Sequence, residues 1–185
     1  EEQESMRKQM RRIIQYLNLL PVQILCLDHI EADDTIAYLT MQYFSTKGSK
    51  VRIVSTDRDF LQLVSENVEV YSPVKKKLYH PETITEEFGI HPDNYLLYRM
   101  VDGDMGDGIP GVNGIGLKTL LKSFPEMTKR PLDFEYLLEQ AQVQMTEKGP
   151  KIYKTILNHK DELDRNFKLM QLAETDIGLD SKLKI

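Results

Sequence analysis

The sequence predicts an α/β fold in which a domain built on a parallel, Rossmann-like sheet is followed by an all-helical subdomain. Between residues 22 and 71, β-prone runs alternate with helical patterns. From residue 84 onward apolar residues recur at helical spacing, and only the glycine-rich segment 103–116 interrupts them. With 185 residues, 41% hydrophobic and 29% charged, the chain is long enough to bury a core and too apolar to be disordered.

The first part of the chain alternates helices and strands. Residues 4–18 carry apolar side chains at helical spacing between lysines and arginines, which predicts an amphipathic helix. Short apolar runs and their flanking turn residues then predict a strand at 22–27, a helix at 35–44, a strand at 51–55, a short helix at 60–64 and a strand at 68–71. Such alternation predicts a parallel sheet with right-handed crossovers.

The second part is predicted to be helical. Two short β-prone pieces flank the lysines at 75–77, and a domain boundary is expected near residue 80, which divides the chain into 1–80 and 81–185. Helical periodicity then predicts helices at 84–88, 94–101, 117–124, 134–145 and 152–172.

The composition also bounds where the protein works. The one cysteine, Cys26, lies in an apolar run, which predicts a small buried side chain in a reducing compartment. No run approaches the roughly 18 apolar residues of a membrane-spanning helix, and the charged N-terminus does not resemble a signal peptide. We therefore expect a cytoplasmic protein with no membrane partner.

The net charge of −5 argues at first against a nucleic-acid partner. Eight of the 29 acids, however, are concentrated in three short segments: Glu31, Asp33, Asp34, Asp57, Asp59, Asp102, Asp104 and Asp107. Without these eight, 21 acids stand against 24 lysines and arginines. The rest of the chain is therefore mildly basic, and DNA binding is not excluded.

The first two acidic clusters each follow a predicted strand and open a predicted helix; they are Glu31, Asp33 and Asp34, and then Asp57 and Asp59. The carboxyl ends of parallel strands meet at one edge of a sheet, so both clusters are expected to face one crevice. Helix capping is the alternative for any single aspartate. It does not explain three acids in four residues, and carboxylate-only ligation favours Mg²⁺ or Mn²⁺ over Zn²⁺.

The third cluster, Asp102, Asp104 and Asp107, accompanies the glycine-rich segment. An EF-hand is excluded, because counting from Asp102 places Asp107 where that loop needs glycine and Asn113 where it needs a bidentate glutamate. If this cluster shares a site with the first two, the oxygens suffice for two metal ions. Two ions activate water and stabilise the leaving oxygen in phosphodiester hydrolysis.

The glycine-rich segment formally matches several phosphate-binding motifs. Gly106 to Gly111 fits the dinucleotide pattern, but it follows a predicted helix instead of a strand and contains a proline. Gly111 and Gly116 have P-loop spacing, but Leu117 stands where lysine is required. The remaining interpretation is a helix-hairpin-helix at 103–124, with a plain turn between helices as the alternative.

A helix-hairpin-helix would bind the DNA backbone. Gly114 and Gly116 allow a tight hairpin and leave amides at a helix start aimed at a DNA phosphate. Lys118 and Thr119 would add contacts to the same backbone. Such contacts position a protein on DNA without reading its sequence.

Three motifs together resemble a known family. They are Glu31-Ala-Asp33-Asp34, then Ser55-Thr-Asp57-Arg-Asp59 followed by Phe60-Leu-Gln-Leu-Val, and then Gly103-Asp104-Met-Gly-Asp107-Gly-Ile-Pro-Gly111-Val-Asn-Gly-Ile-Gly116. In this order, over residues 20–125, they are similar to the 5′-3′ exonuclease and flap endonuclease family. That family includes phage 5′-nucleases and the 5′-nuclease domain of bacterial DNA polymerase I.

The resemblance implies a PIN-like nuclease core in 1–80, a helix-three-turn-helix DNA-binding subdomain in 81–185, and two-metal cleavage of DNA at 5′ flaps and 5′ ends. It also implies a monovalent cation such as K⁺, held by main-chain carbonyls at the hairpin. Carried over by motif, the metal ligands would be Glu31, Asp33, Asp34, Asp57, Asp59, Asp104 and Asp107, with Asp102 outside the pattern.

Some expectations stay open at this point. The family's first strand and its aspartate have no counterpart here, so 1–80 is expected to be the C-terminal part of the core. A monomer in a bacterial or phage-infected cell is expected, and no replication partner can be read from the sequence. The alternatives are a catalytically incomplete helix-hairpin-helix DNA-binding module and a PIN-like RNA nuclease.

Overall fold

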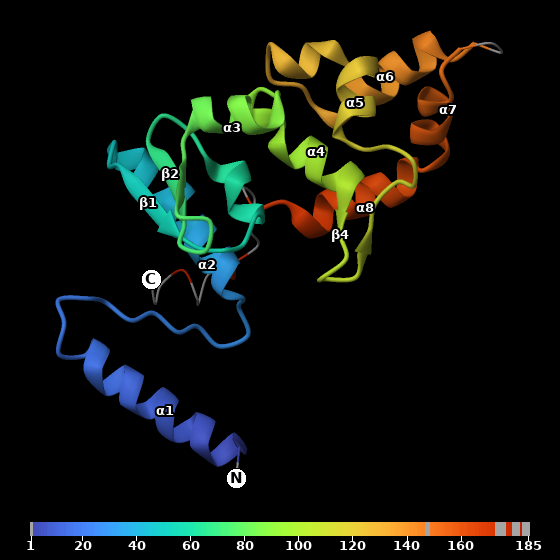
Figure 1. The fold of residues 1–185 in the computed structure, drawn as a ribbon. Helices are drawn as coiled ribbons and strands as arrows, with labels where there is room; N and C mark the ends of the chain where they lie inside the picture. Colours follow the sequence, from blue (N-terminus) through green and yellow to red (C-terminus); the bar gives the residue numbers. More distant parts are fainter. Residues whose placement is uncertain (1, 147–148, 173–176, 179–181, 183–185) are drawn as a thin grey trace.

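The computed structural model describes residues 2–146, 149–172, 177–178 and 182. Its elements form two packed halves, one around a small sheet and one made of helices (Figure 1). Helix α1 (Glu2–Leu17) lies apart from both and is joined to them by a long connection. The predicted succession of an α/β part and a helical part is confirmed.

The sheet has three strands in the order β1, β2, β3. β1 (Val51–Val54) and β2 (Val68–Ser72) are parallel, as predicted, with Val51 opposite Val68. β3 (Lys77–Tyr79) returns antiparallel to β2 and makes the sheet mixed. Buried and partly exposed residues alternate along β2, because successive side chains of a strand point to opposite faces.

Short helices cover the sheet. α2 (Ala32–Tyr38) continues into the π-helical turn η1 (Leu39–Phe44), and η2 (Ser45–Lys47) leads to Gly48 in the left-handed conformation before β1. The turn η3 (Asp59–Leu63) follows β1, and α3 (Pro81–Phe88) follows β3. Together with residues from α4 and Leu172, these elements enclose the first core: Ala37, Ile53, Phe60, Leu61, Leu63, Val64, Val68, Val70, Tyr79, Ile84, Phe88, Ile90, Tyr95, Tyr98 and Leu172.

The helical half consists of α4 (Tyr95–Asp102), α5 (Leu117–Ser123), α6 (Phe134–Gln144), α7 (Lys151–Asn158) and α8 (Lys160–Met170), with the turns η4 (Pro92–Asn94) and η5 (Pro125–Thr128) and the two-stranded hairpin of β4 (Gly103–Asp104) and β5 (Ile109–Pro110). Helix α4 lies between the two halves and contributes side chains to both cores. Its Tyr95 and Tyr98 belong to the sheet core, whereas Leu97 and Met100 belong to the helical core.

The single helix predicted at 152–172 is wrong, since the structure has two helices there. The chain leaves the helical conformation at His159 (φ −104°, ψ 18°). This break lets α7 pack on α6 while α8 packs on α4, and both helices bury apolar side chains, such as Ile156 and Leu163. Tertiary packing therefore overrides a continuous helical pattern.

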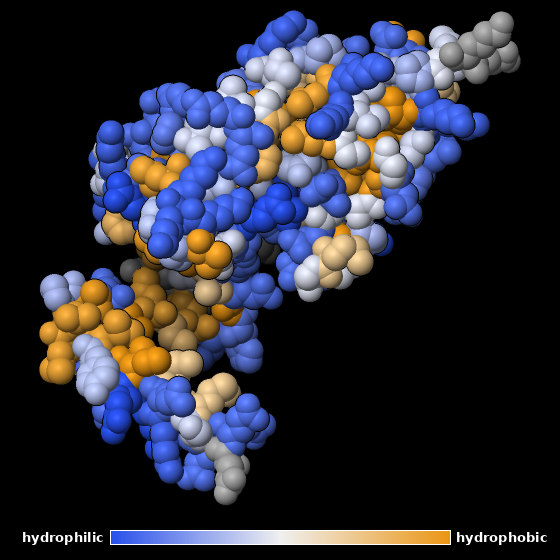
Figure 2. Space-filling model, in the orientation of Figure 1, coloured by the Kyte–Doolittle hydropathy of each residue, from blue (hydrophilic) through white to orange (hydrophobic). Residues whose placement is uncertain are grey.

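The strand predicted at 22–27 does not form, and Cys26, predicted to be buried, is exposed. The described residues offer this segment no neighbouring strand, so its backbone has no ladder to join. Its apolar side chains are exposed together with those after α1, where Figure 2 shows hydrophobic residues gathered. Among the residues that the structure describes, no helix is long and apolar enough to cross a membrane.

Candidate metal centre

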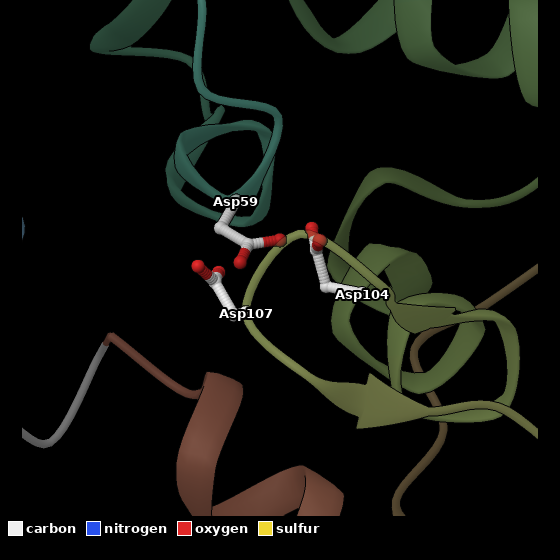
Figure 3. Close-up of side chains that lie close together, drawn as sticks. All are labelled: Asp59, Asp104 and Asp107. Carbon is white, nitrogen blue, oxygen red and sulfur yellow. The ribbon is translucent and has the colours of Figure 1, made fainter.

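Three aspartates from distant parts of the sequence meet at one place. Asp59 comes from η3, and Asp104 and Asp107 come from the β4–β5 hairpin. One carboxylate oxygen of each lies within 4.8 Å of those of the other two. Figure 3 shows the three side chains facing one another across the space between the turn and the hairpin. The cluster thus draws on both parts of the chain, 1–80 and 81–185.

Local hydrogen bonds fix the first carboxylate. After β1 the chain turns, and the amide of Asp57 donates to the hydroxyl of Ser55 at 3.0 Å. The amide of Asp59 donates in turn to the carboxylate of Asp57 at 2.8 Å. Asp57 therefore shapes the turn that presents Asp59.

Close packing of two glycines fixes the hairpin. Gly103 has φ +77°, and a Cβ placed on it would lie 2.3 Å from the amide nitrogen of Gly111. A Cβ on Gly111 would in turn lie 2.0 Å from the carbonyl oxygen of Asp102. Neither position accommodates a side chain. Within the hairpin turn, Asp104 accepts a hydrogen bond of 2.8 Å from the amide of Gly106.

Arg99, which the sequence analysis did not single out, lies beneath the cluster. Its side chain is only 3% exposed, and its guanidinium donates to Asp59 at 2.9 Å, to the carbonyl of Gly103 at 3.0 Å and to Asp104. It also lies 3.7 Å from Asp102. Arg99 therefore joins the two halves of the cluster. The signal in the sequence was one arginine within the apolar predicted helix 94–101.

The two carboxylates that share Arg99 differ in their pKa. Burial raises the pKa of Asp59 above its ordinary value, and the opposing effect of the Arg99 guanidinium is smaller. For Asp104 burial acts in the same direction, but hydrogen bonds from Arg99 and from the amide of Gly106 lower its pKa below the ordinary value. The difference follows from exposure, since the Asp59 side chain is 16% exposed and that of Asp104 is 30% exposed.

We expect the affinity for divalent metal to decrease as the pH is lowered, because of Asp59. A proton and a metal ion compete for this carboxylate, and its raised pKa extends that competition above the ordinary aspartate range near pH 4. Mn²⁺ affinity measured in steps from about pH 4 to about pH 7 should therefore rise with pH. The slope should be smaller in Asp59→Asn, and the same slope in both proteins would contradict the assignment.

The other predicted ligands lie outside this group. Within the described part of the chain, Glu31, Asp33, Asp34 and Asp57 do not join the three clustered aspartates. Asp33 accepts a hydrogen bond from the neighbouring amide of Asp34, and burial, followed by the charge of Asp33, raises the pKa of Asp34. Helix α2, whose first turn carries Asp33 and Asp34, contacts η3, but 22–27 does not form the strand that was expected to place these acids at the same sheet edge as Asp59.

The donor set suits a hard divalent cation. Oxygens around Mg²⁺ at about 2.1 Å lie roughly 3 to 4 Å apart. The three carboxylate oxygens lie within 4.8 Å of one another, so they can converge on one ion. Asp59, Asp104 and Asp107 offer only carboxylate oxygens, which favours Mg²⁺ or Mn²⁺ over Zn²⁺. These three residues would hold one ion.

The predicted DNA-binding residues lie together on one turn. Gly114, Gly116, Lys118 and Thr119 are all exposed around the start of α5. Gly114 has φ +82°, which favours glycine, and Gly116 is the residue before the first helical turn, with no side chain capping it. The helix preceding this turn is α4, and the β4–β5 hairpin is inserted between them.

A groove connects this turn with the carboxylate hairpin. Its volume is about 510 Å³, and it is lined at one end by Asp102 and Met105 and at the other by Gly114 and Gly116. The groove thus joins the candidate phosphate-binding turn to the hairpin that carries Asp104 and Asp107, although the three clustered aspartates do not line it.

Comparison with known proteins agrees with this arrangement. Residues 1–89 match the 5′-3′ exonuclease N-terminal resolvase-like domain. A 5′-3′ exonuclease of Aquifex aeolicus (strain VF5) is 33% identical over 179 residues, which cover 84% of this chain and 62% of that protein. The chain is similar to the 5′-3′ exonuclease family over most of its length. The resemblance inferred from the three sequence motifs is confirmed.

Further similar proteins extend the comparison. The thermostable DNA polymerase I of Thermus aquaticus is 32% identical over 177 residues, covering 96% of this chain and 20% of the polymerase. A zinc-bound structure of the bacteriophage T5 5′-exonuclease has a TM-score of 0.76 at 23% identity, covering 100% of this chain and 69% of that one. This likeness confirms the predicted nuclease fold. The chain spans about three fifths of the length of the curated 5′-3′ exonucleases that it matches.

Proposed function

We propose that this chain hydrolyses DNA phosphodiesters at 5′ flaps and 5′ ends in a divalent-metal-dependent reaction. The observation that carries the proposal is the meeting of Asp59, Asp104 and Asp107. Met105, which lies between the last two in the sequence, lines a groove together with the helix-hairpin-helix turn. Similarity to the family supports the same reaction class. A similar structure, that of a bacteriophage T5 flap endonuclease, is a complex with DNA and metal ions, which supports the DNA substrate.

Each part of the site has a distinct role in this proposal. A bound divalent ion supplies an activated water and a counter-charge for the phosphate. Asp59, Asp104 and Asp107 would hold that ion, and Arg99 orients the carboxylates of Asp59 and Asp104 before it binds. No protein nucleophile is required. We propose Mg²⁺ or Mn²⁺, with Glu31, Asp33, Asp34 and Asp57 completing a second ion site.

The turn before α5 is proposed to bind the duplex. Backbone amides at the start of a helix attract a phosphate, and the exposed Lys118 and Thr119 extend that contact. A K⁺ ion held by main-chain carbonyls of the same turn would add a further positive charge. The groove would then lead the strand from the turn toward Met105 on the hairpin that carries Asp104 and Asp107. In the same proposal the protein acts in the cytoplasm, because its relatives are bacterial and phage proteins, and it acts as a monomer.

The proposal is tested with a labelled 5′-flap duplex, incubated with the 185-residue chain in Mg²⁺ and separately in EDTA, with binding and cleavage scored on the same samples. Cleavage near the flap junction only in Mg²⁺ is the expected result. Binding without cleavage would indicate the alternative, a DNA-binding module. The lack of cleavage would then be explained by the four of the seven predicted ligands that lie outside the cluster. A single-stranded RNA of the same sequence tests the RNA nuclease alternative, and we expect it to stay intact.

Lys118→Ala is expected to weaken DNA binding equally on all sequences and to reduce the dependence of affinity on salt. The reason is that a phosphate contact releases counterions and reads no base, so the slope of log affinity against log salt should fall by about one. Fluorescence anisotropy on two unrelated duplexes at several salt concentrations measures both. Lys50→Ala is the control, because Lys50 precedes β1 at the end of the sheet opposite the Asp59 turn. Equal salt slopes for wild type and Lys118→Ala would remove Lys118 from the interface.

A further inference from the structure

Two amide side chains outside the carboxylate cluster, one buried and one partly buried, tie its two halves to the same helix, α8. One is Asn166 on α8, and the other is Gln62 on η3, three residues after Asp59. Neither carries a charge; Gln62 lies in the apolar run that follows the second acidic motif, and Asn166 lies outside all three motifs. Their hydrogen bonds nevertheless connect α8 to the elements that present the aspartates, η3 through Gln62 and the β4–β5 hairpin through Asn166.

Asn166 holds the base of the hairpin. Asn166 is 1% exposed. Its side-chain amide donates to the carbonyl of Met100 at 3.1 Å and to that of Pro110 at 2.8 Å. Pro110 pairs with Gly103 across the hairpin, directly below the turn that carries Asp104. The carbonyl oxygen of the Asn166 side chain is buried without a partner among the described residues. The two donor bonds are thus the contacts that this side chain makes with the hairpin and α4.

Gln62 connects the other half of the cluster, the turn η3 that carries Asp59, to α8. Its amide nitrogen donates to the carbonyl of Met170 at 2.9 Å, and its amide oxygen accepts from the backbone of Leu172 at 2.9 Å. Both partners lie at the C-terminal end of α8. From Asn166 to Met170 the helix rises about 6 Å, or roughly one turn. One turn of α8 therefore spans the distance from the hairpin of Asp104 and Asp107 to the turn of Asp59.

We infer that Gln62 and Asn166 are positioning residues that use α8 as a rigid spacer to set the separation of Asp59 from Asp104 and Asp107. They act on divalent-ion affinity through these aspartates and touch no metal. The inference rests on the proposed metal-binding function. It differs from the role of Arg99, which contacts the carboxylates themselves.

The test compares Asn166→Asp and Gln62→Met with a matched control, Asn94→Asp. Asn94 is also fully buried, and its amide donates to two carbonyls, those of Met127 and Arg130. Those contacts organise η4 and the segment after η5, and none of them reaches the aspartates. Asn94→Asp should therefore reproduce the loss of stability without the loss of positioning.

Mn²⁺ affinity of the full chain is measured by electron paramagnetic resonance of free Mn²⁺, below the thermal midpoint of each variant. We expect Asn166→Asp and Gln62→Met to weaken Mn²⁺ binding by about 10- to 100-fold. Asn94→Asp should lower the thermal midpoint and leave the Mn²⁺ affinity unchanged. Gln62→Met decides the question if Asn166→Asp does not fold, because Gln62 is only partly buried.

The outcomes separate the two proposals. If wild type binds Mn²⁺ and cleaves DNA but Gln62→Met binds Mn²⁺ equally well, the positioning role is overturned and the proposed function stands. If Asn94→Asp weakens Mn²⁺ binding as much as Gln62→Met does, the effect is general destabilisation and the positioning role is again overturned. If wild type binds no Mn²⁺, the proposed metal site fails and the inference fails with it.

Discussion

Asp104→Asn is expected to lower cleavage of a 5′-flap duplex by on the order of 10²-fold or more while leaving DNA binding intact. Asparagine keeps the shape of the side chain but removes the negative charge that a divalent ion needs, and one of only three clustered carboxylates is lost. DNA affinity should stay the same or rise slightly, because removing a negative charge near the phosphate backbone reduces repulsion. Both quantities are measured on one preparation, by gel assay and by anisotropy.

The matched control is Asp161→Asn, which removes an exposed acid from the first turn of α8 outside the cluster. It should change neither cleavage nor binding. A loss of cleavage in Asp104→Asn that is accompanied by an equal loss of DNA affinity would contradict the assignment of Asp104 as a metal ligand.

Arg99→Met is expected to lower the free energy of unfolding by about 3–5 kcal/mol, the usual cost of removing one partner of a buried ion pair. Methionine fills a similar volume but leaves Asp59 and Asp104 without the guanidinium between them. Mg²⁺ should restore part of the loss, because an ion that binds only the folded protein stabilises it by mass action. Urea unfolding with and without Mg²⁺ measures both effects.

The control for Arg99→Met is Arg52→Met, which removes an ion pair with Glu69 on the sheet. The Arg52 side chain is 60% exposed, so its loss should cost less than about 1 kcal/mol and should not respond to Mg²⁺. If the two substitutions cost the same free energy, Arg99 is not the counter-charge of the cluster.

The sequence predicts those parts of the fold whose signals are local. β1 and β2 follow from β-branched runs bounded by turn residues, and α6 follows from its apolar spacing and from the aspartate that caps it. The strand at 22–27 had an equally clear local pattern, but a strand also needs a neighbour to pair with, and the described residues provide none. The break at His159 was missed for a related reason, since it serves the packing of α7 and α8 on different helices.

In the candidate site, too, some features could be predicted from local sequence signals and others depend on tertiary packing. Asp59, Asp104 and Asp107 could be selected from the spacing of acids and glycines, because chemistry dictates those residue types. That these three meet, and that Glu31 stays apart, depends on the packing of η3 against α4 and on the missing strand. Arg99 and Asn166 leave no motif, because their partners are carbonyls and carboxylates reached only in three dimensions.

The central claim is that Asp59, Asp104 and Asp107 bind the divalent ion with which this chain cuts DNA. It is tested most directly by titrating Mn²⁺ into wild type and Asp104→Asn and measuring bound Mn²⁺ and flap cleavage on the same samples. We predict that in wild type the two curves rise over the same Mn²⁺ range and that both are lost or strongly shifted to higher Mn²⁺ in Asp104→Asn. Mn²⁺ binding that is unchanged in Asp104→Asn would contradict the claim.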